Sequence, residues 1–278
     1  MTIARVLRFR MLSVFLVLAA WAAVSQAGKP TIPAQKAVEG LPAKPLFETM
    51  EAKQVDVKLV HKDEASGNLL IENKTEKPLN VQLPEAFVGV HVLNQGFFGQ
   101  NNGSGNNPFG NQNGQGNGQG QGGQTTGGGA SNNGQSGGPI FSVPPGKVVR
   151  IPVKTVCLEH GRPTPASRME YRIFPVERFS RDPALFELLT TVADGKTPQK
   201  VAQAAAWHLA SEKSWKQLVG MKFRRLGSLP DIPEFTPAQL AAAHQLVENS
   251  QLLAVQKSKP KDGLPVSETV VARRESRQ

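Results

Sequence analysis

The feature that most limits how this chain can fold is a long uncharged stretch in its middle. Residues 96–138 hold 17 of the chain's 27 glycines, and most of the remaining residues in this stretch are Asn and Gln. This composition has too few apolar side chains to build a core, so we expect a disordered loop. Two neighbouring strands can flank such a loop, because the entropy cost of closing it grows only with the logarithm of its length. The fold must then be assembled from the segments on either side.

Short strand patterns lie on both sides of this stretch. Apolar side chains alternate with polar ones, and Gly, Pro, Asn and Lys separate the segments. The expected strands are residues 53–60, 67–73, 79–83, 87–93, 148–158 and 171–176. This close spacing is typical of a small antiparallel sandwich or barrel, and it argues against β-α-β units.

Helices are expected after residue 180, each with a start signal. A capping Asp, Ser or Thr precedes each one, and in three cases Pro follows at the first helical position. The expected helices are residues 184–192, 199–210, 215–221 and 237 to about 255. We therefore predict an α+β protein in which an N-terminal antiparallel β-sandwich-like region packs on a C-terminal group of three or four helices.

The N-terminus has the pattern of a secretory signal peptide. In residues 1–27, Arg5, Arg8 and Arg10 precede an apolar run that ends before a small-residue cleavage site at Ala27. The run of about 14 residues falls short of the roughly 18 that a membrane span needs. We expect a secreted or periplasmic protein with no transmembrane segment after signal cleavage. An uncleaved anchor is the alternative.

Composition suggests how the rest of the chain is divided. Residues 28–45 are expected to be a linker, 46–179 a β-rich region that contains the insert, 180–257 a helical region, and 258–278 a disordered basic tail. A basic tail could bind nucleic acid. No aromatic residue is interleaved with its charges, however, so a solvated end is favoured and nucleic acid is not expected as a partner.

The single cysteine lies at the end of the clearest strand pattern. In residues 148–158 the alternation places Cys157 on the inward face, together with Val149 and Ile151. One cysteine excludes an intramolecular disulfide framework. Cys157 is then a buried inert thiol, an intermolecular partner, a nucleophile, or part of some other covalent link.

A second informative segment is the helix predicted at residues 199–210. From Val201 onward it is apolar nearly all round, with Gln203 and His208 as exceptions, which indicates burial on most sides. Gln203 and Trp207 are four residues apart and share a face. A buried amide needs a partner, since an unsatisfied one costs about 1–3 kcal/mol. The sequence thus predicts an inward cysteine on a strand and a buried glutamine on a helix.

Three segments carry a resemblance to known proteins. Cys157-Leu-Glu-His-Gly-Arg-Pro, Ala-Gln-Ala-Ala-Ala-Trp-His-Leu and Leu79-Asn-Val-Gln-Leu-Pro resemble a group of exported proteins of planctomycete-type bacteria, over most of residues 50–220. That group implies export but brings no established activity.

The first two segments also resemble the motif pair of bacterial thioester domains in surface adhesins. The resemblance implies that the Gln203 side chain acylates the Cys157 sulfur, which gives a covalent electrophile. Ala202, Ala206 and Trp207 fit the flanking pattern, whereas Val156 stands where the family favours an aromatic residue or Leu. The released ammonia would need a proton carrier, and His160 or His208 could serve.

Three interpretations of Cys157 stay open: an inert buried pair with Gln203, a thioester with Gln203, and a nucleophile formed with His160. No cysteine or histidine spacing indicates a metal, and no cofactor is expected. The expected function is an exported cell-envelope or extracellular structural or interaction module, with an internal thioester as one form of it. Its expected partner is a surface or envelope protein or polysaccharide. The less favoured alternative is a hydrolase or transferase.

Overall fold

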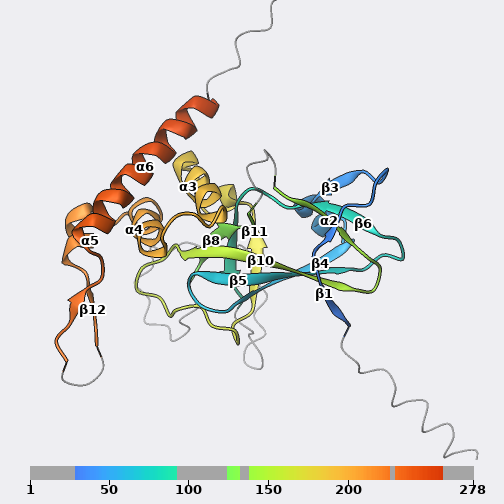
Figure 1. The fold of residues 1–278 in the computed structure, drawn as a ribbon, viewed down its shortest axis with the longest axis horizontal. Helices are drawn as coiled ribbons and strands as arrows, with labels where there is room; N and C mark the ends of the chain where they lie inside the picture. Colours follow the sequence, from blue (N-terminus) through green and yellow to red (C-terminus); the bar gives the residue numbers. More distant parts are fainter. Residues whose placement is uncertain (1–28, 93–123, 132–137, 226–228, 259–278) are drawn as a thin grey trace, which may run out of the picture.

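The computed structural model describes residues 29–92, 124–131, 138–225 and 229–258. The protein is α+β, with most strands in its N-terminal part and most helices in its C-terminal part. Figure 1 shows a barrel with a small sheet at one end and the helices at the other. Within the described ranges, no helix combines the length and apolar character needed to cross a membrane. The expected signal peptide lies outside these ranges, as does the expected tail after Ser258.

Six antiparallel strands close into a barrel. Their order is β10-β5-β4-β11-β7-β8, and β8 pairs with β10 again. They are β4 (Val55–His61), β5 (Ser66–Asn73), β7 (Phe87–His91), β8 (Thr126–Gly129), β10 (Val148–Cys157) and β11 (Tyr171–Phe174). The expected sandwich is therefore wrong. The sheet closes because β10 is long enough to pair with β5 along its first seven residues and with β8 along its last four.

Strand β8 lies inside the stretch for which the sequence predicts disorder, and that prediction is wrong for residues 124–131. All four residues of β8 are buried. Its glycines allow backbones to approach: a Cβ on Gly128 would lie 1.9 Å from the carbonyl oxygen of Lys154, and one on Gly129 would lie 2.6 Å from that of Glu85. Glycine is the residue expected where strands come this close. Residues 96–123 and 132–137 of the expected loop lie outside the described residues.

A second sheet covers the far end of the barrel, in the order β2-β9-β6-β3. Its strands are β2 (Gln35–Lys36), β3 (Ala43–Pro45), β6 (Leu79–Gln82) and β9 (Ile140–Val143), and α2 (Leu46–Glu51) follows β3. In addition, β1 (Thr31–Pro33) pairs in parallel with β10. The expected linker at 28–45 is therefore wrong from Thr31 onward. Its strands escaped notice because two or three residues are too few to show an alternation.

The helices begin close to where the sequence predicts. They are α3 (Pro183–Ala193), α4 (Gln199–Ala210), α5 (Trp215–Gly220) and α6 (Pro237–Ser258), after a short 3₁₀ turn η1 (Val176–Arg178). Asp182 accepts a hydrogen bond from the Ala184 amide, and Ser214 forms a capping box with Gln217. The start of α4 differs: it follows Pro198, and no side chain caps it. A two-stranded hairpin, β12 (Lys222–Phe223) and β13 (Ile232–Pro233), interrupts the helices.

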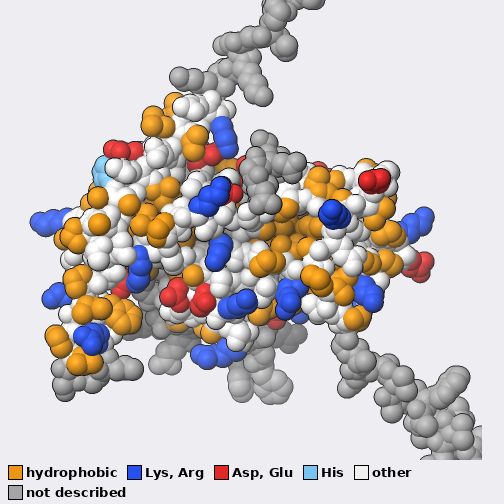
Figure 2. Space-filling view, viewed as in Figure 1, with side chains coloured by type: hydrophobic (Ala, Val, Ile, Leu, Met, Phe, Trp, Pro, Cys, Tyr) orange, Lys and Arg blue, Asp and Glu red, His pale blue; other side chains and the backbone are white. Residues whose placement is uncertain are grey.

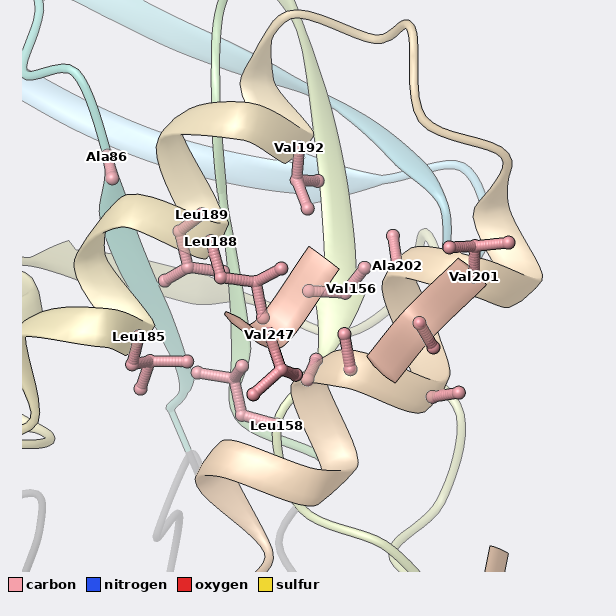
Figure 3. Packing of buried hydrophobic residues seen from close by; sticks show 14 of the residues in the cluster. Ala86, Val156, Leu158, Leu185, Leu188, Leu189, Val192, Val201, Ala202 and Val247 are labelled. Atoms are coloured by element: carbon pink, nitrogen blue, oxygen red, sulfur yellow. The ribbon is translucent and has the colours of Figure 1, made fainter. Parts of the chain in front are cut away.

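The helices pack on the outside of the barrel. At the end of β10 the outward side chains Val156 and Leu158 are buried because α3 and α4 cover them (Figure 3). Helix α6 packs against α3 and α4 through the face that holds Leu240, Ala243 and Val247. A separate core fills the barrel and the space under the second sheet. The last residues of β10 therefore lie between two cores.

Candidate functional site

Cys157 is the last residue of β10 and is buried, with 3% of its surface exposed. It lies directly opposite Thr126 of β8, so the two side chains are on the same, inward face of the barrel. Burial raises the pKa of the Cys157 thiol to about 12, with a smaller contribution from the charge of Glu64. The thiol is therefore protonated at neutral pH, which makes it a poor nucleophile.

Gln203 of α4 binds the backbone of Cys157 through both ends of its side-chain amide. Its Oε1 accepts a hydrogen bond from the Cys157 N–H at 2.9 Å, and its Nε2 donates one to the Cys157 carbonyl oxygen at 2.7 Å. The expected burial of both residues is confirmed. The amide takes the place that a neighbouring strand would occupy in the sheet.

Other side chains of α4 and the residue after it continue this pattern along the same stretch of backbone. Gln199, one turn before Gln203, donates from Nε2 to the carbonyl oxygen of Thr155 at 3.1 Å. Ser211 donates to the carbonyl oxygen of Leu158 at 2.6 Å and accepts from the N–H of His160 at 3.0 Å. Pairing with β5 ends at Lys154. We call Gln199, Gln203 and Ser211 the polar seam, because they provide hydrogen-bond partners where that strand has ended.

The geometry of the pair bears on the expected thioester. A strand side chain stands roughly perpendicular to the sheet, whereas the Gln203 amide is held by the strand backbone. Thiol attack would require the amide to leave two hydrogen bonds and the thiol to lose a proton that burial holds tightly. The structure brings the two residues together, and the covalent bond stays a prediction.

His160 and Trp207 lie beside this pair and contact each other. Their rings meet edge to face, with centroids 4.7 Å apart. Burial and the nearby Lys213 lower the pKa of His160. No hydrogen bond joins the His160 ring to Cys157 among the described contacts, so the Cys–His nucleophile has no direct geometric support. Trp207 also packs on Phe235, and its buried Nε1 has no hydrogen-bond partner among the described residues.

His208 lies away from Cys157, at the contact between α4, α5 and α6. Its ring stacks on Trp215 with centroids 4.3 Å apart, and its Nδ1 lies 2.7 Å from the carbonyl oxygen of Lys213. Trp215 contacts His244 of α6 as well. His208 therefore joins α4 to α5 and α6, and the structure shows no contact between it and Cys157.

A polar cleft of about 520 Å³ opens where the polar seam ends. It lies between the loop that follows β10, the turn after η1 and the end of α4. Its lining includes charged groups of both signs, hydroxyl groups, an imidazole and a phenyl ring: Glu159, His160, Arg162, Phe179, Ser180, Ser211 and Lys213. Arg162 pairs with Glu159, whose carboxylate also accepts a hydrogen bond from the Thr125 amide. The rim is thus tied to the barrel through the residues that precede β8.

The barrel interior near Cys157 contains a polar cluster that the sequence pattern alone does not predict. His61 is fully buried, its Nε2 lies 3.2 Å from Thr126 Oγ1, and its ring contacts Tyr171 edge to face. Burial lowers the pKa of His61 to about 4, although the backbone and carboxylate of nearby Asp63 act in the opposite direction. Its Nδ1 has no hydrogen-bond partner of normal geometry among the described residues.

The sequence carries a signal for two of the residues that were not predicted, His61 and Gln199. His61 continues the inward alternation of Val57 and Leu59, so extending that pattern by one step would have placed it inside the barrel. Gln199 and Gln203 have the four-residue spacing that puts both on one helix face. The described residues hold no group of three or more His, Cys, Asp or Glu side chains that could bind a metal.

No family model matches the chain, and no curated protein or solved structure matches it either.

Proposed function

We propose that this chain is an exported cell-envelope or extracellular interaction module that binds an envelope polysaccharide in the polar cleft. The cleft itself carries the proposal, because it combines size, charge of both signs and a rim that Ser211 of the polar seam holds. Carbohydrates present hydroxyl groups that both donate and accept hydrogen bonds, together with apolar ring faces. Arg162, Ser180 and Phe179 match these three needs in one place.

Rigidity of the rim supports the same proposal. Ser211 holds the carbonyl of Leu158 and the amide of His160, which fixes the loop that presents Glu159 and Arg162. A site that is ordered before binding loses less conformational entropy when a ligand arrives. The buried pair of Cys157 and Gln203 lies beneath this loop and serves as its anchor.

Pelleting with isolated cell-wall polysaccharide tests the proposal. The variant Arg162→Ala/Lys213→Ala removes two cations from the cleft, and Lys36→Ala/Lys44→Ala removes two from the second sheet at the other end of the molecule. Hydrogen bonds to charged groups contribute about 1.5–3 kcal/mol each, so we expect at least about tenfold weaker binding for the cleft variant. The second-sheet variant should bind as the wild type does. Equal binding by both variants, or none by the wild type, would reject the cleft as the site.

A covalent form of this function is the second candidate, and the contact between Gln203 and Cys157 favours it. In that form the Cys157 sulfur adds to the Gln203 amide carbon, the C–N bond breaks and ammonia leaves with the thiol proton. Intact mass would then be lower by one ammonia, and Cys157→Ala would restore the full mass. An unmodified mass, with a thiol that resists alkylation until the protein unfolds, would leave the non-covalent form.

A further inference from the structure

The hairpin between α5 and α6 exposes apolar side chains to an unusual degree. Phe223 of β12 lies directly opposite Ile232 of β13, so both side chains project from the same face of the ribbon. Phe223 is 54% exposed and Ile232 is 45% exposed, and Val219 and Leu229, which are near them in the sequence, are also exposed. These four are nearly half of the nine large hydrophobic residues that are exposed in the described part of the chain.

The same hairpin is strongly basic. Lys216, Lys222, Arg224 and Arg225 lie on it or next to it, and Asp231 is the only acid in the described residues from 216 to 233. Glu234, which follows, is paired with Lys200 of α4. We call residues 219–225 and 229–233 the basic hairpin.

The basic hairpin projects from the body of the protein. Figure 1 shows β12 extending away from the helices and the barrel, and Figure 2 shows hydrophobic and basic side chains side by side on that projection. A flat surface can therefore reach it without first meeting the barrel. In the described residues, the strands of this hairpin pair with each other and with no other strand.

We propose that the basic hairpin docks on an anionic lipid bilayer. At the interface of a bilayer, Phe223 and Ile232 would enter the region between headgroups and acyl chains, while the long side chains of the adjoining Arg224 and Arg225 reach phosphate groups. Segments that combine a small apolar face with cations bind in this way, through buried apolar area and attraction to anionic headgroups. Long basic side chains also keep their charge in the headgroup layer while their stems lie along apolar surface.

Charge favours the bilayer over a second copy of the chain. Two such hairpins placed together would bring eight cations against two acids at one contact, and like charges in contact are repelled. An anionic bilayer offers the complementary charge and an apolar layer at once.

Vesicle flotation tests the proposal, with phosphatidylcholine vesicles that contain or lack phosphatidylglycerol. Every variant is made in the complete chain, so that the N-terminal apolar run and the basic tail contribute equally to all. The variants are Phe223→Ser/Ile232→Ser, Arg224→Gln/Arg225→Gln, and the control Leu252→Ser/Leu253→Ser, which removes two exposed apolar side chains from α6. The far-ultraviolet circular dichroism spectrum of each variant checks its fold.

The wild type and the α6 control should bind the anionic vesicles equally. Both should bind vesicles without phosphatidylglycerol only weakly. We expect at least about tenfold weaker binding when the apolar pair is removed, because the half-exposed Phe223 and Ile232 still have about half of their surface to bury. Removing the arginine pair should weaken binding by about thirtyfold at low salt, from about fivefold per cation.

Two results would overturn the proposal. In one, the hairpin variants bind the anionic vesicles as tightly as the wild type does. In the other, sedimentation shows a wild-type dimer that Phe223→Ser/Ile232→Ser converts to a monomer, while vesicle binding is absent. The hairpin would then be a contact between copies of this chain.

Discussion

The two edges of β10 near Cys157 are completed in opposite ways. On one edge β8 provides backbone groups alone, from a strand that is mostly glycine. On the other edge α4 provides side chains, because Gln199 and Gln203 bind the backbone of Thr155 and Cys157. The same stretch of strand thus has a neighbour that pairs through its backbone on one side and a neighbour that pairs through its side chains on the other.

The two edges satisfy the same requirement, hydrogen bonding of buried backbone groups, in two different ways. Buried backbone N–H and C=O groups must be paired, whatever provides the partner. A backbone partner needs no particular side chain, but where another backbone crowds it, as at Gly128 and Gly129, only glycine fits. A side-chain partner can come from a helix, but then specific residues are needed at specific positions. Substitutions should therefore act on the two edges through different physical causes.

The largest effect is expected on the helix edge. Gln203→Leu leaves the N–H and C=O of Cys157 buried without partners, at about 1–3 kcal/mol for each group, so we expect a loss of about 4 kcal/mol in the free energy of unfolding. Gln199→Leu removes one bond to a partly buried carbonyl and should cost about 1 kcal/mol. Urea unfolding measures both. Equal losses in the free energy of unfolding would show that the two hydrogen bonds of Gln203 to the Cys157 backbone contribute no more than the single one of Gln199.

On the glycine edge, Gly128→Ala should cost about 3 kcal/mol. Its new methyl group would lie 1.9 Å from the carbonyl oxygen of Lys154, a backbone atom that cannot move without separating β8 from β10. Gly220→Ala is the matched control, because no atom lies within 4 Å of the added Cβ. Thermal unfolding should show little change for the control. A stable Gly128→Ala variant would mean that β8 is not held against β10 as described.

Behind the glycine edge, His61 should make stability depend on pH. Its pKa is lowered from 6.5 to about 4 in the folded protein, so the unfolded chain binds the extra proton more readily. Stability is then full above pH 6.5 and is lost as the pH falls towards 4, by up to about 2–3 kcal/mol. His91 and His160 shift in the same direction. The difference between the wild type and His61→Gln therefore isolates the contribution of His61, and an equal slope for both would exclude it.

The smallest effect is expected at the cysteine itself. Cys157→Ala removes one buried sulfur but keeps every backbone hydrogen bond on both edges, so we expect a loss of about 1 kcal/mol. The native thiol should react with iodoacetamide only as fast as the barrel opens, because burial raises its pKa to about 12. Fast alkylation of the folded protein would show that the thiol is accessible.

Sequence patterns predicted the parts of the fold that follow from local periodicity. β4 and β10 have clear alternation, and α3, α5 and α6 have capping residues before them, so all five were located closely. The burial of Gln203 followed from the apolar surroundings of its helix. These features depend on residues that are near in sequence.

What the sequence could not predict depends on long-range pairing. A run of glycines shows no alternation, so the sequence pattern predicts a disordered loop where β8 lies and a sandwich where the barrel closes. The partner of Gln203 could not be read from its helix, because the choice between the sulfur and the backbone of Cys157 depends on how α4 lies against β10. The same holds for Ser211, whose partners lie about fifty residues earlier in the chain.

The glycines of β8 also have a consequence for tolerance to mutation. In a segment of low complexity, most substitutions are expected to pass unnoticed, since there is little packing to disturb. A saturation scan across residues 96–138 should instead show intolerance at Gly127, Gly128, Gly129 and Gly138, where every added Cβ would lie within 3 Å of another atom. Deep sequencing of a selected library would find these four glycines retained in the variants that still fold.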